Sequence, residues 1–251
     1  MEWVTLNRPD VANALNGEMV DALTDYFEGL RNREGVRIIV LGASGRHFSA
    51  GADLSGDAFA DAHRTPRNVW TLQRRIARVY LAMRRCPQPI IALVQGAACG
   101  GGFSLVLAAD IRIAGESARM NAAYIKIGLT GCDMGSSYFL PRLVGTSVAS
   151  ELLLTGRYIH APRALAVNLV SAVVPDHELA SAARPTSPIC WRLHPWDYAS
   201  PRTPEFQRGC VGLEAAMAVE DRQQSLLALT EDAVEAGMAF LPKREPKYRD
   251  R

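Results

Sequence analysis

Three consecutive glycines, Gly100-Gly101-Gly102, stand between two apolar segments in the middle of the chain. The segment from Pro89 to Gly96 has the β-rich composition of a buried strand, and the one that ends at Asp110 suits a buried helix. Glycine lets a ligand approach the backbone closely, and free N–H groups at a helix start carry partial positive charge. The pattern predicts a place for a developing oxygen anion, although tight packing alone explains such glycines equally well.

Other chemistries are excluded by spacing and composition. The glycines do not form the G-x-G-x-x-G dinucleotide fingerprint, and no Lys-Ser/Thr follows them to make a phosphate loop. A formal net charge of +2 over 251 residues, with basic residues scattered, gives no reason to expect nucleic acid as a partner. The five cysteines include no C-x-x-C pair, which argues against a disulfide framework or a zinc site and favours a reducing cytosol. No apolar run reaches membrane-spanning length, so we expect a cytoplasmic protein without a membrane partner.

Strands alternating with helices must position the glycines. The apolar periodicity predicts strands at 3–6, 36–41, 90–94 and 111–114, and helices at 16–31, 67–85, 101–109, 136–144 and 147–155. This order predicts an α/β chain with largely parallel strand pairing. Residues 184–210 contain five prolines, which forbid a long helix there, and helical character returns at 211–240 before a basic tail. We therefore predict a core domain at 1–183, an irregular segment at 184–210 and a C-terminal helical region at 211–251.

Short motifs match one known family in their order along the chain. They are Thr5-Leu6-Asn7-Arg8-Pro9, Asn13-Ala14-Leu15-Asn16, Phe48-Ser49-Ala50-Gly51-Ala52-Asp53-Leu54, the stretch 89–110, Leu140-Pro141-Arg142-Leu143-Val144-Gly145, Glu151-Leu152-Leu153-Leu154-Thr155-Gly156 and Asn168-Leu169-Val170. With them the chain resembles the crotonase superfamily, the enoyl-CoA hydratase/isomerase family. The resemblance is close over residues 3–180 and loose over 211–248. Any one motif is weak support, whereas the ordered set is specific.

The resemblance implies a spiral of ββα units followed by C-terminal helices that form trimers, often paired into hexamers. It implies an acyl-CoA thioester as substrate, with coenzyme A as part of that substrate and no separate cofactor. The thioester oxygen of the enolate would bind the N–H groups of Ala52 and Gly101, which agrees with the glycine-rich helix start. By the same match, Ala50 would line the adenine pocket. We also expect Asp53, Gly100, Ser104 and Tyr124 among the substrate-binding residues.

The chain departs from the hydratases of this family at both catalytic glutamates. Ser104 and Tyr124 stand at those positions. Neither replaces a carboxylate as a base near neutral pH, since tyrosine has a reference pKa of about 10 and serine is weaker still. The substitutions argue against efficient hydration by the usual mechanism.

One carboxylate remains nearby, that of Asp133 in Gly131-Cys132-Asp133-Met134-Gly135. In peroxisomal-type enoyl-CoA isomerases and dienoyl-CoA isomerases an acid at this position shuttles a proton, and in 4-chlorobenzoyl-CoA dehalogenases an aspartate at a similar place attacks the ring. The resemblance therefore implies a single-carboxylate site with Asp133 as proton carrier. The alternative is a turn aspartate that caps the helix beginning near Gly135.

Other charged residues have structural interpretations. We expect Asp53 to hold the oxyanion loop through backbone N–H groups. We expect Asp110 to be a structural hydrogen-bonding residue and Glu151 to be an ion-pair partner. Lys243 and Tyr248 resemble the family's residues that close over the ligand, but this match is of low specificity.

Three functions stay open. Double-bond isomerisation is preferred, a hydratase with altered acid–base geometry is the alternative within enzymes, and a catalytically silent acyl-CoA-binding protein is the alternative from another class. The segment 184–210 does not resemble the family, and is either an insertion-like loop or the result of an altered reading frame. A first strand usual in the family is expected to be missing, because the motif at 5–9 lies so close to the start.

Overall fold

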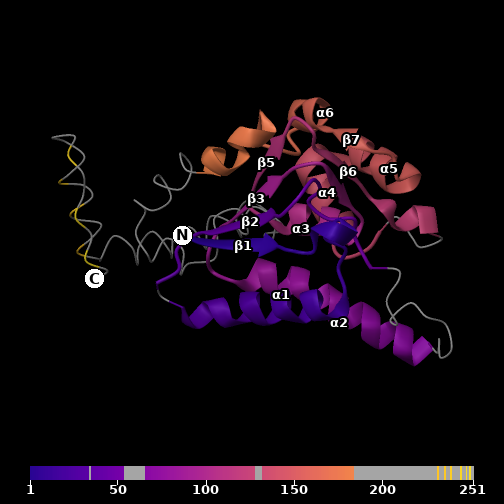
Figure 1. The fold of residues 1–251 in the computed structure, drawn as a ribbon, viewed down its shortest axis with the longest axis horizontal. Coiled ribbons are helices and arrows are strands. Elements are labelled where there is room, and N and C mark those ends of the chain that lie inside the picture. The colour runs from indigo at the N-terminus through magenta and orange to yellow at the C-terminus, as the bar shows by residue number, and fades with distance from the viewer. Residues whose placement is uncertain are drawn as a thin grey trace, which may run out of the picture.

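A five-stranded parallel sheet forms the centre of the fold in the computed structural model, which describes residues 1–33, 35–53, 66–127 and 132–183 and six single positions from 231 to 249. Its strands, in spatial order, are β1 (Glu2–Leu6), β2 (Ile39–Ala43), β3 (Ile90–Val94), β5 (Ile111–Gly115) and β8 (Ala172–Val174). Each strand pairs in parallel with its neighbour. Figure 1 shows β1, β2, β3 and β5 side by side. The predicted α/β class is confirmed.

The sheet is buried on both faces, which is why its central strand is apolar throughout. All five residues of β3 are buried, as is typical of parallel strands covered on both sides. On one face the sheet packs against the helices of the main core. On the other face Val40, Ile91 and Leu93 pack against Leu179 and Ala183 from the segment that follows β8.

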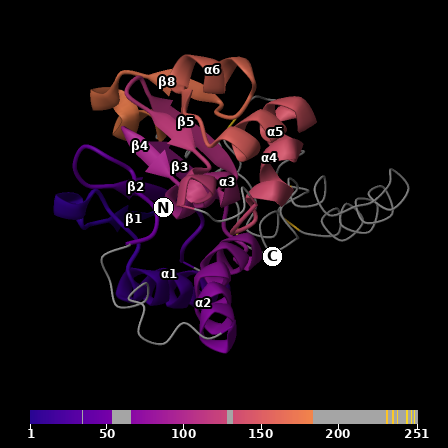
Figure 2. The same ribbon diagram turned by 90° about the vertical axis from the view of Figure 1, so that its right-hand side faces the viewer.

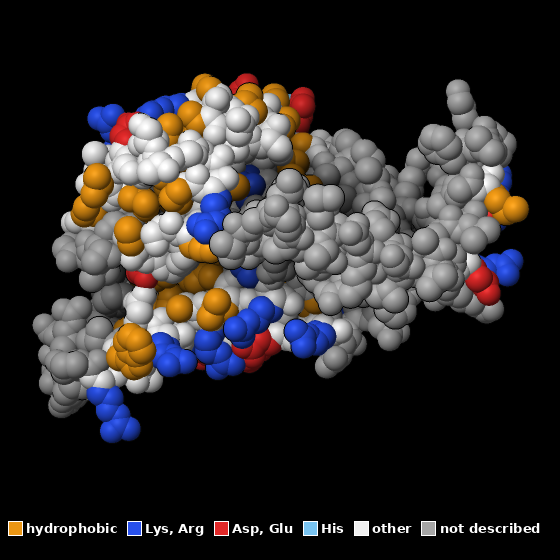
Figure 3. Space-filling model, turned by 180° about the vertical axis from the view of Figure 1, so that it is seen from behind, with side chains coloured by type: hydrophobic (Ala, Val, Ile, Leu, Met, Phe, Trp, Pro, Cys, Tyr) orange, Lys and Arg blue, Asp and Glu red, His pale blue; other side chains and the backbone are white. Residues whose placement is uncertain are grey.

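Two parallel helices cover one side of the molecule (Figures 1 and 2). Helix α1 (Gly17–Gly29) begins at the predicted N-cap, since the side chain of Asn16 accepts a hydrogen bond from the Met19 N–H at 3.0 Å. Helix α2 (Pro66–Arg85) packs beside it. Figure 3 shows basic side chains with acidic ones between them over this part of the surface. The two helices are linked there by the ion pairs Arg75–Asp21 and Arg78–Glu28.

A smaller sheet and four further helices complete the described core. The small sheet contains β4 (Ala97–Cys99), β6 (Arg119–Asn121) and β7 (Ile159–His160). The helices are α3 (Gly101–Ala108), α4 (Ser136–Val144), α5 (Thr146–Thr155) and α6 (Ala161–Ala166), and the 3-10 helices are η1 (Pro9–Val11), η2 (Leu30–Asn32), η4 (Ala123–Ile127) and η5 (Asp176–Glu178). Every residue of α3 is buried, so this helix runs through the interior.

The five helices predicted between residues 16 and 155 are confirmed to within a few residues, and the strand expected at 36–41 begins later, at Ile39. Apart from single positions, the helical region predicted at 211–240 lies outside the described residues. The small sheet was not predicted, because strands of two or three residues are too short to show an alternating pattern. Most of the segment at 184–251 lies outside the described residues, so the divisions at 184 and 211 stay predictions. Within the described part of the chain, no helix combines the length and apolar character needed to cross a bilayer.

Candidate active site

The start of α3 lies directly against the loop formed by residues 49–53. A Cβ on Gly102 would come within 2.6 Å of the Ser49 Cβ and 2.8 Å of the Ser49 carbonyl oxygen, so only glycine fits here. Gly51 has a φ of 92°, and a Cβ on it would lie 2.7 Å from the Cys99 carbonyl oxygen and 3.5 Å from the Gly101 nitrogen. Gly51 and Gly102 therefore allow the backbones of the loop and of α3 to lie in close contact. This contact places the two predicted oxyanion segments side by side.

Leu15 contacts both segments that carry the N–H groups assigned to the thioester oxygen. Its N–H donates to the Gly51 carbonyl at 2.7 Å, and its carbonyl accepts from the Asp53 N–H at 3.0 Å. This parallel bridge directs the N–H of Ala52 away from Leu15. Gly101 is the first residue of α3, where an N–H has no acceptor within the helix. No hydrogen bond between described residues uses either N–H, and the Leu15 Cδ1 lies 3.1 Å from the position of a Cβ on Gly101.

Asn13, the first residue of the motif at 13–16, holds the segment of chain that leads into this loop. Its side chain is fully buried, and its Nδ2 donates to the carbonyl oxygens of Ser44 and His47, each at 2.8 Å. The Ser49 Oγ donates to the Asn13 carbonyl at 2.8 Å. The resemblance of residues 13–16 to the family thus corresponds to a structural role in shaping residues 44–49.

Asp53 holds the other end of the loop, and one of its partners is the Arg8 side chain, which the sequence did not indicate. Its Oδ2 forms an ion pair with an Arg8 guanidinium nitrogen at 2.9 Å, and the same nitrogen donates to the Ala14 carbonyl at 2.6 Å. The Asp53 carboxylate is largely buried, with 11% of its side chain exposed. The family motif around Arg8 and the loop that carries Ala52 are therefore one linked unit.

The residues at the two glutamate positions bind each other. Ser104 and Tyr124 are buried, and their hydroxyl groups form a hydrogen bond. The Tyr124 hydroxyl also donates to the Gly100 carbonyl at 2.9 Å, while the Gly100 N–H donates to the Asn121 carbonyl at 3.0 Å. Burial raises the pKa of Tyr124 well above its ordinary value, so its hydroxyl stays protonated. No carboxylate stands at either position.

Tyr80 and Met134 lie beside the oxyanion glycine, and neither was singled out from the sequence. The Tyr80 hydroxyl donates to the Gly101 carbonyl at 3.0 Å. The position of a Cβ on Gly101 is 3.0 Å from the Tyr80 Oη and 3.2 Å from the Met134 Sδ. Burial raises the pKa of Tyr80, which keeps this hydroxyl neutral as well. Tyr80 belongs to the apolar face of α2, where periodicity alone indicates a core residue.

Asp133 is the carboxylate of this site. It is half-buried, directly precedes Met134, and its Oδ1 accepts hydrogen bonds from the Gln73 side chain and, at 2.7 Å, from the Met134 N–H. Burial raises the pKa of Asp133 above its ordinary value, although both hydrogen bonds act in the opposite direction. The capping alternative is wrong, because Gly135 is the N-cap of α4 and no side chain caps that helix.

The remaining predicted residues are distributed as follows. Ala50 is exposed, and its N–H donates to the Ala12 carbonyl at 2.8 Å. Lys243 and Tyr248 lie outside the described residues. Glu151 is confirmed as an ion-pair partner, of Arg157 and Arg163. Asp110 is confirmed as a structural residue, because its carboxylate accepts from the Arg84 guanidinium and the Ile90 N–H, each at 2.8 Å.

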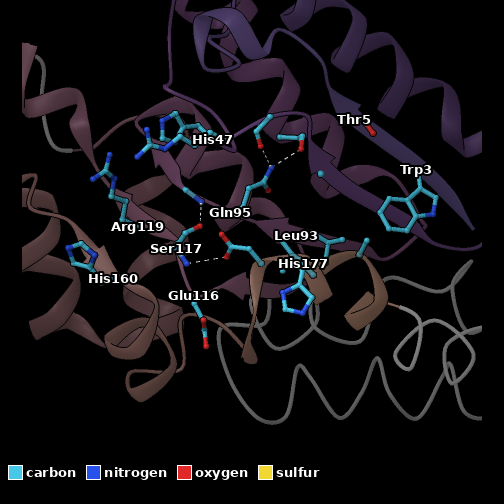
Figure 4. A pocket seen from close by; sticks show the side chains of 18 residues that line it. Trp3, Thr5, His47, Leu93, Gln95, Glu116, Ser117, Arg119, His160 and His177 are labelled. Carbon is cyan, nitrogen blue, oxygen red and sulfur yellow. Dashed lines mark hydrogen bonds between the residues drawn. The ribbon is translucent and has the colours of Figure 1, made fainter.

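A cavity of about 850 Å³ opens elsewhere, at the carboxyl ends of the parallel strands. Figure 4 shows His47, Arg119 and His160 towards one end and Trp3 at the other. Ser117 lies between them, where it accepts from the Gly96 N–H at 2.9 Å. Of the predicted site residues that the structure describes, none lines this cavity. Among the described residues, no cluster of His, Cys, Asp and Glu has the arrangement of a metal site.

Comparison with known proteins gives one consistent result. The family model described as "Enoyl-CoA hydratase/isomerase" matches residues 2–251. A probable enoyl-CoA hydratase of Mycobacterium bovis is 36% identical over 252 residues, spanning 98% of this chain and 88% of that protein. The 2,3-dehydroadipyl-CoA hydratase of Escherichia coli is 33% identical over 248 residues, spanning 99% and 94%. The crystal structure of an enoyl-CoA hydratase from Mycobacterium smegmatis superposes with a TM-score of 0.90 at 32% identity, covering 98% of this chain and 94% of that one.

Proposed function

Since the chain belongs to the enoyl-CoA hydratase/isomerase family, we propose that it binds an acyl-CoA thioester and moves a double bond within the acyl group. In this proposal the N–H groups of Ala52 and Gly101 bind the thioester oxygen, and Asp133 carries the proton. The family and its crotonase fold follow from the comparisons.

The two N–H groups stabilise negative charge where it develops. When a proton leaves the acyl chain, the electron pair of the broken C–H bond moves into the thioester, and its oxygen becomes an enolate oxygen. The N–H of Gly101 carries the partial positive charge of the α3 terminus, and that of Ala52 adds a second donor. A preorganised donor of this kind is typically worth about 2.7–4 kcal/mol in the transition state.

Asp133 supplies the proton transfer. Its carboxylate takes a proton from the α or γ carbon and returns it to the other of these two carbons, so that the double bond moves and the carboxylate is regenerated. One base is sufficient, because no atom is added to the substrate. The raised pKa of Asp133 brings it closer to neutral pH, which favours efficient proton transfer in both directions.

The observation that carries the preference for isomerisation is the hydrogen bond between Ser104 and Tyr124. At the two positions where the family's hydratases hold glutamates, this chain has neutral hydroxyl groups that bind each other and the Gly100 carbonyl. Neither group acts as a base for water at neutral pH. Since the Asp53 carboxylate is ion-paired with Arg8, Asp133 is the carboxylate that we assign to proton transfer within the described part of the chain.

Hydration is the second candidate, favoured by the names of the relatives, which include hydratases of Mycobacterium bovis and Escherichia coli. In that reaction Asp133 would activate the water that attacks the β carbon, and the same residue would then deliver the proton to the α carbon. The alternative geometry requires room for water next to Asp133.

We also propose the assembly and location that the family implies, a cytoplasmic homotrimer or dimer of trimers. Because both candidate reactions are redox-neutral, the proposal includes no cofactor other than the coenzyme A part of the substrate. Light scattering after size exclusion would measure the assembly, and a mass equal to one chain would contradict it. Turnover that is lost after dialysis against a chelator would contradict the absence of a cofactor.

The deciding experiment compares the wild type with Asp133→Asn on 2-enoyl-CoA, 3-enoyl-CoA and dienoyl-CoA substrates, with acyl-CoA binding measured in parallel. Asp25→Asn, at an exposed position of α1, is the matched control. We expect isomerisation to collapse in Asp133→Asn while binding persists and the control behaves as wild type. Formation of a hydroxyacyl-CoA by the wild type would select hydration. Binding without turnover by any variant would indicate a silent acyl-CoA-binding protein.

A further inference from the structure

Gln73 approaches the proposed site from α2. It lies seven residues before Tyr80, a spacing that places both on the same face of a helix. Tyr80 binds the Gly101 carbonyl, and Gln73 donates from its side-chain amide to Asp133 Oδ1. A single face of α2 therefore contacts both the oxyanion segment and the carboxylate of the site.

The two oxygens of the Asp133 carboxylate differ in their hydrogen bonds. Oδ1 accepts from Gln73 and from the Met134 N–H. No hydrogen bond between described residues uses Oδ2, although an ionised carboxylate oxygen accepts up to two. Two donors on one oxygen hold the carboxylate plane in place, and they leave the other oxygen for the substrate.

We propose that Gln73 is a positioning residue for Asp133, and that Oδ2 is the oxygen that removes and returns the substrate proton. This inference rests on the function proposed above. Gln73 itself does not touch the reacting atoms. It acts by holding Oδ1, so that the proton-carrying oxygen keeps one position through both halves of the transfer.

The arrangement has a consequence for the pH dependence of turnover. A donor to the ionised carboxylate favours the charged form, so loss of Gln73 raises the pKa of Asp133. Among the described residues, the titratable groups that face Asp133 are Tyr80 on α2 and Tyr124 on η4, both of which burial keeps neutral. Because Asp133 must be ionised to take the proton, turnover rises with pH through its pKa. Loss of the donor should move this acid limb to higher pH by about one unit.

The test is the pH profile of kcat and KM for Gln73→Met, which keeps the length of the side chain and its helix propensity but removes the donor. Arg74→Gln, at an exposed position of the same helix, is the control. We expect an acid limb shifted upward, about tenfold lower kcat below the limb, and little change in KM. Gln73→Glu is the second variant. Its charge beside Asp133 should shift the limb further in the same direction.

Two results would overturn the inference. One is a profile of Gln73→Met that coincides with that of Arg74→Gln, and the other is a uniform loss of kcat with an unmoved limb, which indicates a structural role alone. These outcomes differ from failure of the proposed function, in which Asp133→Asn itself keeps its turnover. If Asp133→Asn is inactive and both Gln73 variants retain the wild-type limb, only the role of Gln73 is disproved.

Discussion

Ser104 and Tyr124 stand twenty residues apart in the chain, and their hydroxyl groups are hydrogen-bonded in the interior. The single proton of the Tyr124 hydroxyl goes to the Gly100 carbonyl at 2.9 Å, so the Ser104 hydroxyl is the donor between the two side chains. The pair thereby holds Gly100, the residue directly before α3. Its contribution is to the geometry of the oxyanion segment, and we expect its loss to be seen first in stability.

Replacement of Tyr124 by phenylalanine should lower the free energy of unfolding by about 1–3 kcal/mol, because the buried Ser104 hydroxyl loses its acceptor. The double variant Ser104→Ala/Tyr124→Phe removes both groups, so its loss should be smaller than the sum of the two single losses. Urea unfolding of the four proteins gives the coupling free energy. Additive losses would mean that the hydrogen bond does not contribute.

Gly102→Ala should separate the loop at 49–53 from α3, because the new Cβ would lie 2.6 Å from the Ser49 Cβ. A displacement of about 1 Å at a catalytic site costs on the order of a hundredfold in rate. We therefore expect kcat to fall by about this factor in a folded protein. Gly29→Ala is the control, since nothing lies within 4 Å of that position. Equal activity of both variants would show that the contact with Ser49 does not set the site.

Asp110→Ala should destabilise the protein without changing its chemistry. Asp110 and Arg84 form an ion pair in which 5% and 10% of the side chains are exposed, and removal of one partner of a buried pair costs about 3–5 kcal/mol. Thermal unfolding should show a lower midpoint, while the pH profile of turnover stays that of the wild type. A profile altered in the same way as that of Asp133→Asn would place Asp110 in the reaction after all.

Glu151 should contribute a pH-dependent part of stability. The guanidinium groups of Arg163 and Arg157 lower the pKa of Glu151 from its ordinary 4.5 to about 2 in the folded protein. A lowered folded pKa means that this stabilisation is present above pH 4.5 and is lost as the pH falls towards 2. The stability difference between wild type and Glu151→Gln should therefore shrink over this range, as urea midpoints would show. Turnover at neutral pH should not change, and a large loss would contradict the structural role of Glu151.

Local signals were sufficient to predict the helices of the core and the glycine-rich start of α3. Asn16 precedes the apolar period of α1 and is its N-cap, and the glycines after β3 open α3. Contacts between distant segments could not be predicted in this way. Gln73 meets Asp133 across sixty residues of chain, and nothing in the neighbourhood of either residue indicates the other. The sequence also allowed the Asp133 side chain to be a helix cap, and only the structure shows that it does not cap α4.

The dependence of the loop at 49–53 on residues 8–15 limits how this enzyme can be redesigned. The conformation of the loop depends on other residues, because Arg8, Asn13 and Leu15 bind it through an ion pair and hydrogen bonds. A graft that imports only this loop from a relative would lack the contacts from residues 8–15 that set its conformation. The smallest transplantable unit consists of two pieces of chain more than thirty residues apart, which must be exchanged together.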